Sequence, residues 1–199
     1  MSTENFDIIF IRPYGTGKSS VARLVVDQLN LTLRSLDETY YHYLRQFPGY
    51  NSALENEIGN WDLVSPLRQP YDLFVVEKFL TDRSLDLRIC TLELGVSHSL
   101  YKDRIYLDRI KRIFMPYPNI FLLIPSPDIE ESLSELLRRI RLHGIKGRNL
   151  SDEAVNQINR YALEVSSNYE LAKFIIHTKG KSPEETAKNV LEYTTINLP

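Results

Sequence analysis

The sequence predicts an α/β protein of three layers, in which a five-stranded parallel sheet lies between two layers of helices. Five short apolar runs recur along the chain, and segments with a helical pattern separate them. Strands that alternate with helices favour a parallel sheet with right-handed crossovers. A length of 199 residues, 43% of them hydrophobic, suits one domain over residues 1–199. The expected strands are 7–11, 31–36, 88–94, 119–124 and 174–177.

The first expected strand leads through a short turn into the first expected helix. Residues 7–11 are expected to form the strand, because Ile8–Ile11 is apolar without alternation, which is typical of a strand buried on both faces. Residues 18–29 have a helical pattern with one apolar face, formed by Val21, Leu24, Val25 and Leu29.

The turn between them has the pattern of a phosphate-binding loop, Gly15-Thr16-Gly17-Lys18-Ser19-Ser20. In such a loop, backbone N–H groups and the helix N-terminus bind phosphate, Lys18 reaches the β and γ phosphates, and Ser19 ligates Mg²⁺. One position departs from the motif, because Arg12 stands where its first glycine is expected. Either arginine tolerates the backbone conformation there, or the entry to the loop is altered.

The second expected strand is followed at once by an acidic residue. Asp37 comes directly after 31–36, and ligands of open α/β sheets bind outside the carboxyl ends of the strands. We therefore expect Asp37 to face the same crevice as the phosphate loop. Residues 38–85 form an aromatic-rich insertion, with a helix over 67–80 that Pro70 interrupts near its start. This insertion carries an acceptor site in one interpretation and is a cover packed on the sheet in the other.

The third expected strand runs into small and polar residues, Glu93-Leu94-Gly95-Val96-Ser97-His98-Ser99, which suggests a ligand loop. Glu93 is either a second candidate acid or the partner of a nearby arginine. His98 either contacts a substrate or forms a hydrogen bond within its loop. A helix over 102–114 precedes the fourth strand.

The remaining helices have recognisable start signals. Ser126 is the expected N-cap of the next helix, with Pro127 at its first position. Its buried stripe is expected at Ile129, Leu133, Leu136, Leu137 and Ile140. Another helix is expected over 151–165, and the capping box from Ser182 to Glu185 opens the last one.

A basic, glycine-interrupted segment follows the Ser126 helix. It contains Arg138, Arg139, Arg141, His143, Lys146 and Arg148, with Gly144 and Gly147. A segment of this kind suits a lid over residues 141–151 that closes on phosphates, and it also suits a solvated surface turn.

The bulk composition excludes several classes of protein. The net charge of −2 gives no basic excess for nucleic acid, and no apolar run approaches a membrane span. The polar start of the chain is unlike a signal peptide. The single cysteine, Cys90, excludes a disulfide framework and is expected to be a buried thiol. We expect a cytoplasmic monomer or dimer.

These motifs together resemble those of the shikimate kinase branch of the P-loop small-molecule kinases, over nearly the whole chain. The resemblance is carried by the phosphate loop, Asp37, Arg148-Asn149-Leu150 and the stretches 167–172 and 180–185. It implies the P-loop kinase fold, ATP and Mg²⁺ as cofactors, and a small-molecule acceptor. It further implies that Asp37 binds the acceptor hydroxyl and that Arg148 belongs to the lid.

Four positions depart from that family. They are Arg12 in the phosphate loop, Ser35 in place of a first aspartate, Gly95-Val96-Ser97 in place of a triple glycine, and Glu164 with Val165 where an arginine binds the acceptor carboxylate. All four lie at the expected phosphate and acceptor sites. They leave the fold prediction intact and argue against shikimate as the substrate.

The predicted function is transfer of the ATP γ-phosphoryl group to a small-molecule hydroxyl. The expected catalytic residues are Lys18, Asp37 and Arg148. The nucleotide would be bound by the phosphate loop with Arg139 and Arg141, and the acceptor by Asp37, Glu93, Gly95 and His98. One alternative is a nucleoside or nucleotide kinase, with Arg68 or Arg83 lining a basic acceptor pocket. The other is a nucleotide-binding regulatory protein without catalysis.

Overall fold

A computed structural model describes residues 7–60, 62–82, 90–145 and 150–194. The strands are β1 (Ile8–Ile11), β2 (Thr32–Ser35), β3 (Cys90–Glu93), β4 (Asn119–Ile124) and β5 (Phe174–His177). The α-helices are α1 (Lys18–Leu29), α2 (Leu36–Leu44), α3 (Ser52–Asn60), α4 (Gln69–Thr81), α5 (Arg104–Phe114), α6 (Ile129–His143), α7 (Asp152–Glu164), α8 (Ser166–Leu171) and α9 (Pro183–Tyr193). Two short 3₁₀ helices are η1 (Pro66–Arg68) and η2 (Val96–Ser99).

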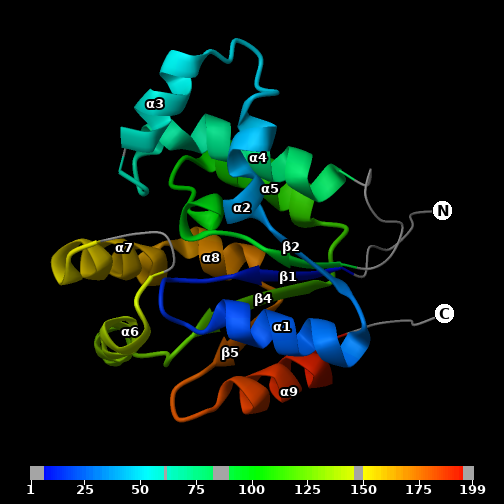
Figure 1. The fold of residues 1–199 in the computed structure, drawn as a ribbon, viewed down its shortest axis with the longest axis vertical. Helices are drawn as coiled ribbons and strands as arrows, with labels where there is room; N and C mark the ends of the chain where they lie inside the picture. The colour runs from blue at the N-terminus through cyan, green and yellow to red at the C-terminus, as the bar shows by residue number, and fades with distance from the viewer. Residues whose placement is uncertain (1–6, 61, 83–89, 146–149, 195–199) are drawn as a thin grey trace.

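The sheet is five-stranded and parallel, in the order β2-β3-β1-β4-β5, which confirms the predicted α/β class. β1 lies in the middle, so its carboxyl end, where the phosphate loop starts, has a strand on each side. Helices cover both faces of the sheet, with α1 and α9 on one and α4, α5 and α8 on the other (Figure 1).

The side chains of β1 show why this strand is apolar without alternation. Ile8 and Phe10 pack with α1 and α9, whereas Ile9 and Ile11 pack into the core on the opposite face. All four are fully buried. A strand buried on both faces has no solvent-facing side for polar residues.

The insertion folds as a group of helices. α2, α3, η1 and α4 lie together beyond the sheet (Figure 1), and their buried side chains belong to the larger core cluster. Pro70 does not interrupt α4, because it lies in the first turn, where the backbone N–H has no partner within the helix.

Several predicted boundaries needed correction. β2 ends at Ser35, and Leu36 already belongs to α2, so Asp37 lies in the first turn of a helix. The N-cap of α6 is Asp128, whose carboxylate accepts from the Glu131 N–H at 2.7 Å, and not Ser126.

Other helices match more closely. In α6, Leu133, Leu136 and Ile140 are buried, while Ile129 and Leu137 are only partly so. The capping box at Ser182 and Glu185 is confirmed. The prediction for the thiol of Cys90 falls on a side chain outside the described part, since only the backbone of Cys90 is described.

Candidate functional site

The phosphate loop closes around two glycines that no other residue replaces without strain. Gly15 and Gly17 have φ values of 81° and 83°, a region that side chains disfavour. A Cβ on Gly15 would lie 2.9 Å from the side chain of Ile140 and 3.0 Å from the carbonyl oxygen of Leu136, so α6 packs directly on the loop. Gly17 caps α1, with the hydroxyl-bearing Ser19 and Ser20 exposed in its first turn. This backbone fits a phosphate group at the helix N-terminus.

Lys18 is buried at the start of α1 and contacts the end of β3. Its Nζ lies 3.4 Å from Oε2 of Glu93 and donates to the carbonyl oxygen of Leu94 at 3.5 Å. Burial lowers the pKa of Lys18 to about 7; the nearby Arg12 guanidinium also lowers it, and Glu93 opposes both. The other carboxylate oxygen of Glu93 is buried without a hydrogen-bond partner. The structure thus pairs Glu93 with the loop lysine, whereas the sequence offered a candidate acid or the partner of an arginine.

Arg12 occupies the first glycine position without backbone strain. Among the described residues other than glycine, Asn30 is alone in having a positive φ. Nη1 of Arg12 donates to the carbonyl oxygen of Pro13 at 3.1 Å, and its guanidinium lies 5.9 Å from the ring centre of Tyr14. Of the two sequence-based options, the structure therefore favours the first, because arginine adopts an ordinary backbone conformation here.

Asp37 approaches the backbone of Gly95 so closely that no side chain fits between them. A Cβ on Gly95 would lie 2.1 Å from Oδ1 of Asp37 and 3.0 Å from Cε1 of His98. Nδ1 of His98 accepts from the Gly95 N–H at 2.9 Å, so the proton of the neutral ring is on Nε2. Burial lowers the pKa of His98 and keeps the ring neutral. The sequence-predicted residues Asp37, Gly95 and His98 therefore meet at the end of β3.

A second set of buried polar side chains, which the sequence did not single out as a group, supports His98. The ring of Tyr40 stacks on that of His98, with centroids 5.4 Å apart. The Tyr40 hydroxyl donates to Oδ1 of Asp72 at 2.8 Å, and Nε of Arg68 lies 3.5 Å from Oδ2 of Asp72. Arg68 also donates to the carbonyl oxygen of Ile58 at 2.7 Å. The aromatic positions of α2 were visible in the sequence, but their partners on α4 were not.

Arg139 of α6 contacts the phosphate loop. Its Nη1 donates to the carbonyl oxygen of Thr16 at 3.3 Å and to the hydroxyl of Thr178 at 3.0 Å. The carboxylate of Glu135 accepts from its Nε at 2.7 Å. Arg141 instead lies exposed and pairs with Asp152 at the start of α7. The prediction for Arg148, in the expected lid, falls outside the described residues.

Asn159 holds the loop through a pair of hydrogen bonds that the sequence did not suggest. Its Oδ1 accepts from the Tyr14 N–H at 2.8 Å, and its Nδ2 donates to the Tyr14 carbonyl oxygen at 3.2 Å. Both residues are buried. Asn159 is an isolated polar residue among the apolar positions of α7, and that was the one available signal.

The chain was compared with known proteins. No family model and no curated protein sequence matches it. Solved structures do match. A gluconokinase from Sinorhizobium meliloti 1021 is 17% identical with a TM-score of 0.59, covering 96% of this chain and 93% of its own. The shikimate kinase from Acinetobacter baumannii is 16% identical with a TM-score of 0.56, covering 95% and 93%. The tunicamycin resistance protein of Deinococcus radiodurans is 16% identical with a TM-score of 0.56, covering 98% and 99%.

This chain has the shikimate kinase fold. At these identities the likeness shows the fold alone. The predicted P-loop kinase fold is confirmed by it.

One of the four departures from that family, Glu164 with Val165, has a plain structural setting. Val165 is 8% exposed and belongs to a hydrophobic cluster with Tyr14 and Ile140. Glu164 is exposed and lies 3.6 Å from Arg160, which also pairs with Glu130. Neither side chain can attract an acceptor carboxylate, because one is apolar and the other carries the same sign of charge.

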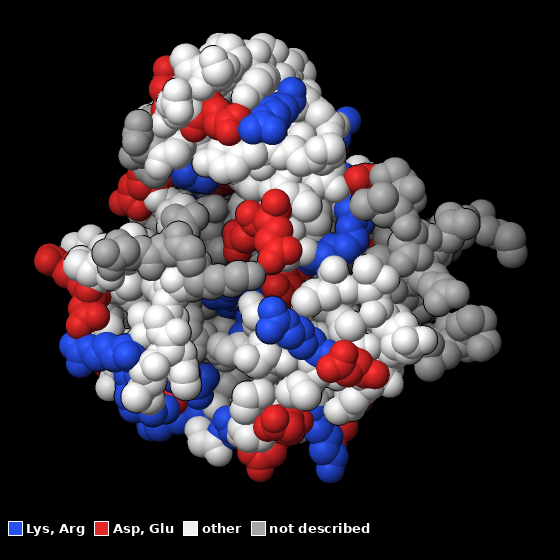
Figure 2. Space-filling view, viewed as in Figure 1, with Lys and Arg blue, Asp and Glu red and all other residues white. Residues whose placement is uncertain are grey.

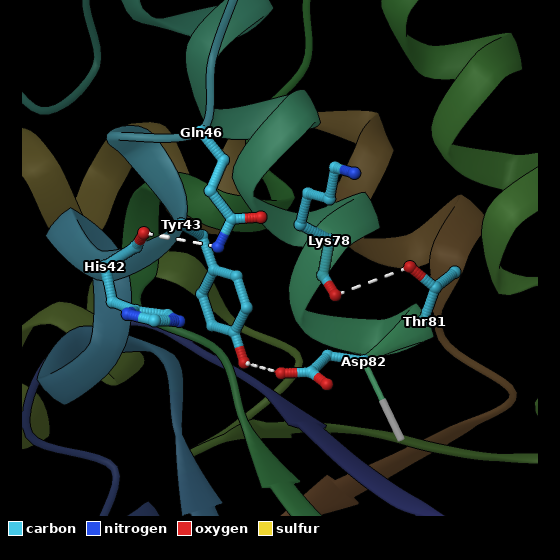
Figure 3. Close-up of a pocket in the computed structure, with 6 residues that line it drawn as sticks. All are labelled: His42, Tyr43, Gln46, Lys78, Thr81 and Asp82. Atoms are coloured by element: carbon cyan, nitrogen blue, oxygen red, sulfur yellow. Dashed lines mark hydrogen bonds between the residues drawn. The ribbon is translucent and has the colours of Figure 1, made fainter. Parts of the chain in front are cut away.

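A polar cavity of about 380 Å³ lies apart from this site, between α2 and α4 (Figure 3). Its lining residues are His42, Tyr43, Gln46, Lys78, Thr81 and Asp82. The Tyr43 hydroxyl donates to Asp82 at 2.8 Å across the cavity floor. None of these residues belongs to the phosphate loop or to the end of β3.

Surface charge, possible metal ligands and helix hydrophobicity further characterise the protein. The face seen in Figure 2 carries acidic and basic side chains together, in keeping with a net charge of −2. No cluster of three histidine, cysteine or acidic residues able to hold a metal occurs in the described ranges. A kinase Mg²⁺ is typically held by few side chains, by phosphates and by water, so Ser19 fits this role without such a cluster. In the described part of the chain, no helix is long and apolar enough to cross a membrane.

Proposed function

We propose that the chain is an ATP-dependent kinase that transfers the γ-phosphoryl group to a hydroxyl of a small molecule. One observation carries this proposal: the loop lysine and the candidate base contact two adjacent residues at the end of β3, Leu94 and Gly95. Lys18 donates to the carbonyl of Leu94, and the Asp37 carboxylate lies against Gly95, the next residue. Phosphoryl donor and acceptor would therefore meet at the carboxyl end of β3, as phosphoryl transfer requires.

The residues have distinct tasks in this reaction. Lys18 would bind the β and γ phosphates, and the loop backbone held by Arg139 and Asn159 would keep its N–H groups aimed at them. Asp37 would orient the acceptor hydroxyl and take its proton as the acceptor oxygen bonds to the γ phosphorus. The bond from the γ phosphorus to the bridging oxygen then breaks, and ADP leaves. Mg²⁺, ligated by Ser19, would supply further neutralisation of the phosphates.

Gluconate and shikimate kinases among the structural neighbours suggest a polyhydroxylated acceptor. The apolar Val165 and the acidic Glu164 argue against an arginine-bound carboxylate at that position. Arg141 remains a predicted nucleotide contact and Arg148 a predicted catalytic residue, both within the expected lid over 141–151. The insertion over 38–85 remains the predicted acceptor-binding part. Cytoplasmic location and a monomeric or dimeric state also stay predictions.

Nucleotide binding and turnover test the proposal together. Lys18→Ala should reduce MgATP affinity at least tenfold in calorimetry, whereas Lys188→Ala, an exposed lysine of α9, should leave it unchanged. A panel of polyols, sugars and nucleosides is then screened for ADP release above the level of Lys18→Ala. Unchanged MgATP binding in Lys18→Ala would contradict the nucleotide site. Tight binding with no acceptor turnover above that variant would instead favour the regulatory alternative.

A further inference from the structure

Arg12 lies beside the place where the candidate base meets β3. β1 and β3 are parallel with Phe10 opposite Glu93, and the Leu94 N–H donates to the carbonyl oxygen of Phe10 at 3.1 Å. Continuing this register by two residues brings Arg12 level with Gly95. The Asp37 carboxylate lies against Gly95, because a Cβ added to Gly95 would be 2.1 Å from Oδ1 of Asp37. The backbone of Arg12 therefore lies level with the residue that the Asp37 carboxylate contacts.

The guanidinium of Arg12 has few partners of its own. Within the described part of the chain, Nη1 of Arg12 donates to the adjacent carbonyl oxygen of Pro13, and its Nε is buried without a partner. No ion pair joins Arg12 to any residue within the described ranges. A buried N–H group without a partner costs free energy that a ligand can recover.

The surroundings of Arg12 bring two cations and two carboxylates close together. Burial lowers the pKa of Arg12, and the carboxylates of Asp37 and Glu93 oppose this effect. Arg12 in turn lowers the pKa of Lys18. Two cations that repel each other in one buried site would both be stabilised by a phosphate placed between them.

We propose that Arg12 binds the phosphoryl group during transfer, as a cation contributed by the phosphate loop itself. The inference rests on the proposed kinase function and adds a catalytic residue to it. The planar guanidinium can donate two bonds to the equatorial oxygens of the γ phosphorus, where negative charge is spread in the transition state. Lys18 neutralises the β and γ phosphates before transfer, and Arg12 acts on the group that moves toward Asp37.

A single substitution distinguishes an Arg12 that binds the phosphoryl group from an Arg12 that merely blocks the phosphate loop. Arg12→Gly restores the usual loop residue, so an arginine that merely blocked the loop would be relieved and turnover would rise. If Arg12 binds the transferred group, kcat should fall about 10²- to 10³-fold, with the KM for ATP changed less than about threefold. Arg12→Lys should recover part of the loss. Arg23→Gly, at an exposed position of α1, is the matched control for charge removal.

A binding measurement keeps the test decisive when the acceptor is unknown. MgADP with aluminium fluoride imitates the transferring phosphoryl group, and wild-type protein should bind MgADP at least tenfold more tightly in its presence. Arg12→Gly should lose this enhancement and keep its affinity for MgADP alone. Equal enhancement in both proteins, no enhancement in wild type, or faster turnover in Arg12→Gly would each overturn the inference. Loss of MgADP binding on Lys18→Ala, measured separately, shows whether the proposed nucleotide site itself stands.

Discussion

Gly95→Ala should displace the candidate base while leaving the phosphate loop in place. The new Cβ would lie 2.1 Å from Oδ1 of Asp37, whereas Cβ contacts below 3.0 Å essentially do not occur. The carboxylate must therefore retreat by about 0.9 Å or more, and a misplacement of about 1 Å costs roughly 10²-fold in rate. We expect kcat to fall about 10²-fold, with MgATP affinity nearly unchanged.

The assay is steady-state phosphoryl transfer with the best acceptor of the panel, paired with thermal denaturation. Gly59→Ala is the matched control, because its Cβ would meet the Tyr41 hydroxyl at an ordinary 3.8 Å and α3 should tolerate or favour alanine. Asp37→Asn removes the base without a clash and should lose a comparable fraction of kcat. A Gly95→Ala protein that is folded and within threefold of wild-type kcat would refute the placement of Asp37 as the base.

Three further predictions concern the loop and its support. MgADP affinity should fall by up to tenfold per pH unit above about pH 7, because phosphate binds protonated Lys18 and burial lowers the pKa of Lys18 to about 7. Calorimetry from pH 6.5 to 9 measures this affinity, and a flat profile would contradict the prediction. Asn159→Leu should lower the free energy of unfolding in urea by about 2–4 kcal/mol and weaken MgADP binding, since the Tyr14 N–H and C=O lose their partner side chain. Asn156→Leu, on the same helix, is the control and should change both quantities little. Tyr40→Phe should cost about 1–2 kcal/mol, because a buried carboxylate loses a donor at 2.8 Å, and an unfolding free energy equal to wild type would be the contrary result.

The sequence alone determined the strands, most helices and the phosphate loop, because these depend on local patterns. The four apolar residues Ile8–Ile11 fit a strand that is covered on both faces, and β1 has that place in the middle of the sheet. The Gly15–Ser20 pattern, the capping box at Ser182 and the position of Asp37 shortly after β2 could likewise be predicted from the sequence. Boundaries were less secure, since Ser126 and Asp128 both offer a capping oxygen and only the folded geometry selects Asp128.

The tertiary structure decided everything that depends on residues far apart in the chain. Asn159 holds Tyr14 across 145 positions, Arg139 reaches Thr16 across 123, and the pairing of Lys18 with Glu93 requires β1 and β3 to be neighbours. No local pattern encodes such contacts, because a single buried polar residue has many candidate partners until the chain is folded. The sequence identified Arg12 as a departure from its motif. Only the register of β1 and β3 placed it beside Gly95, at the carboxyl end of the sheet where the loop lysine and Asp37 come together.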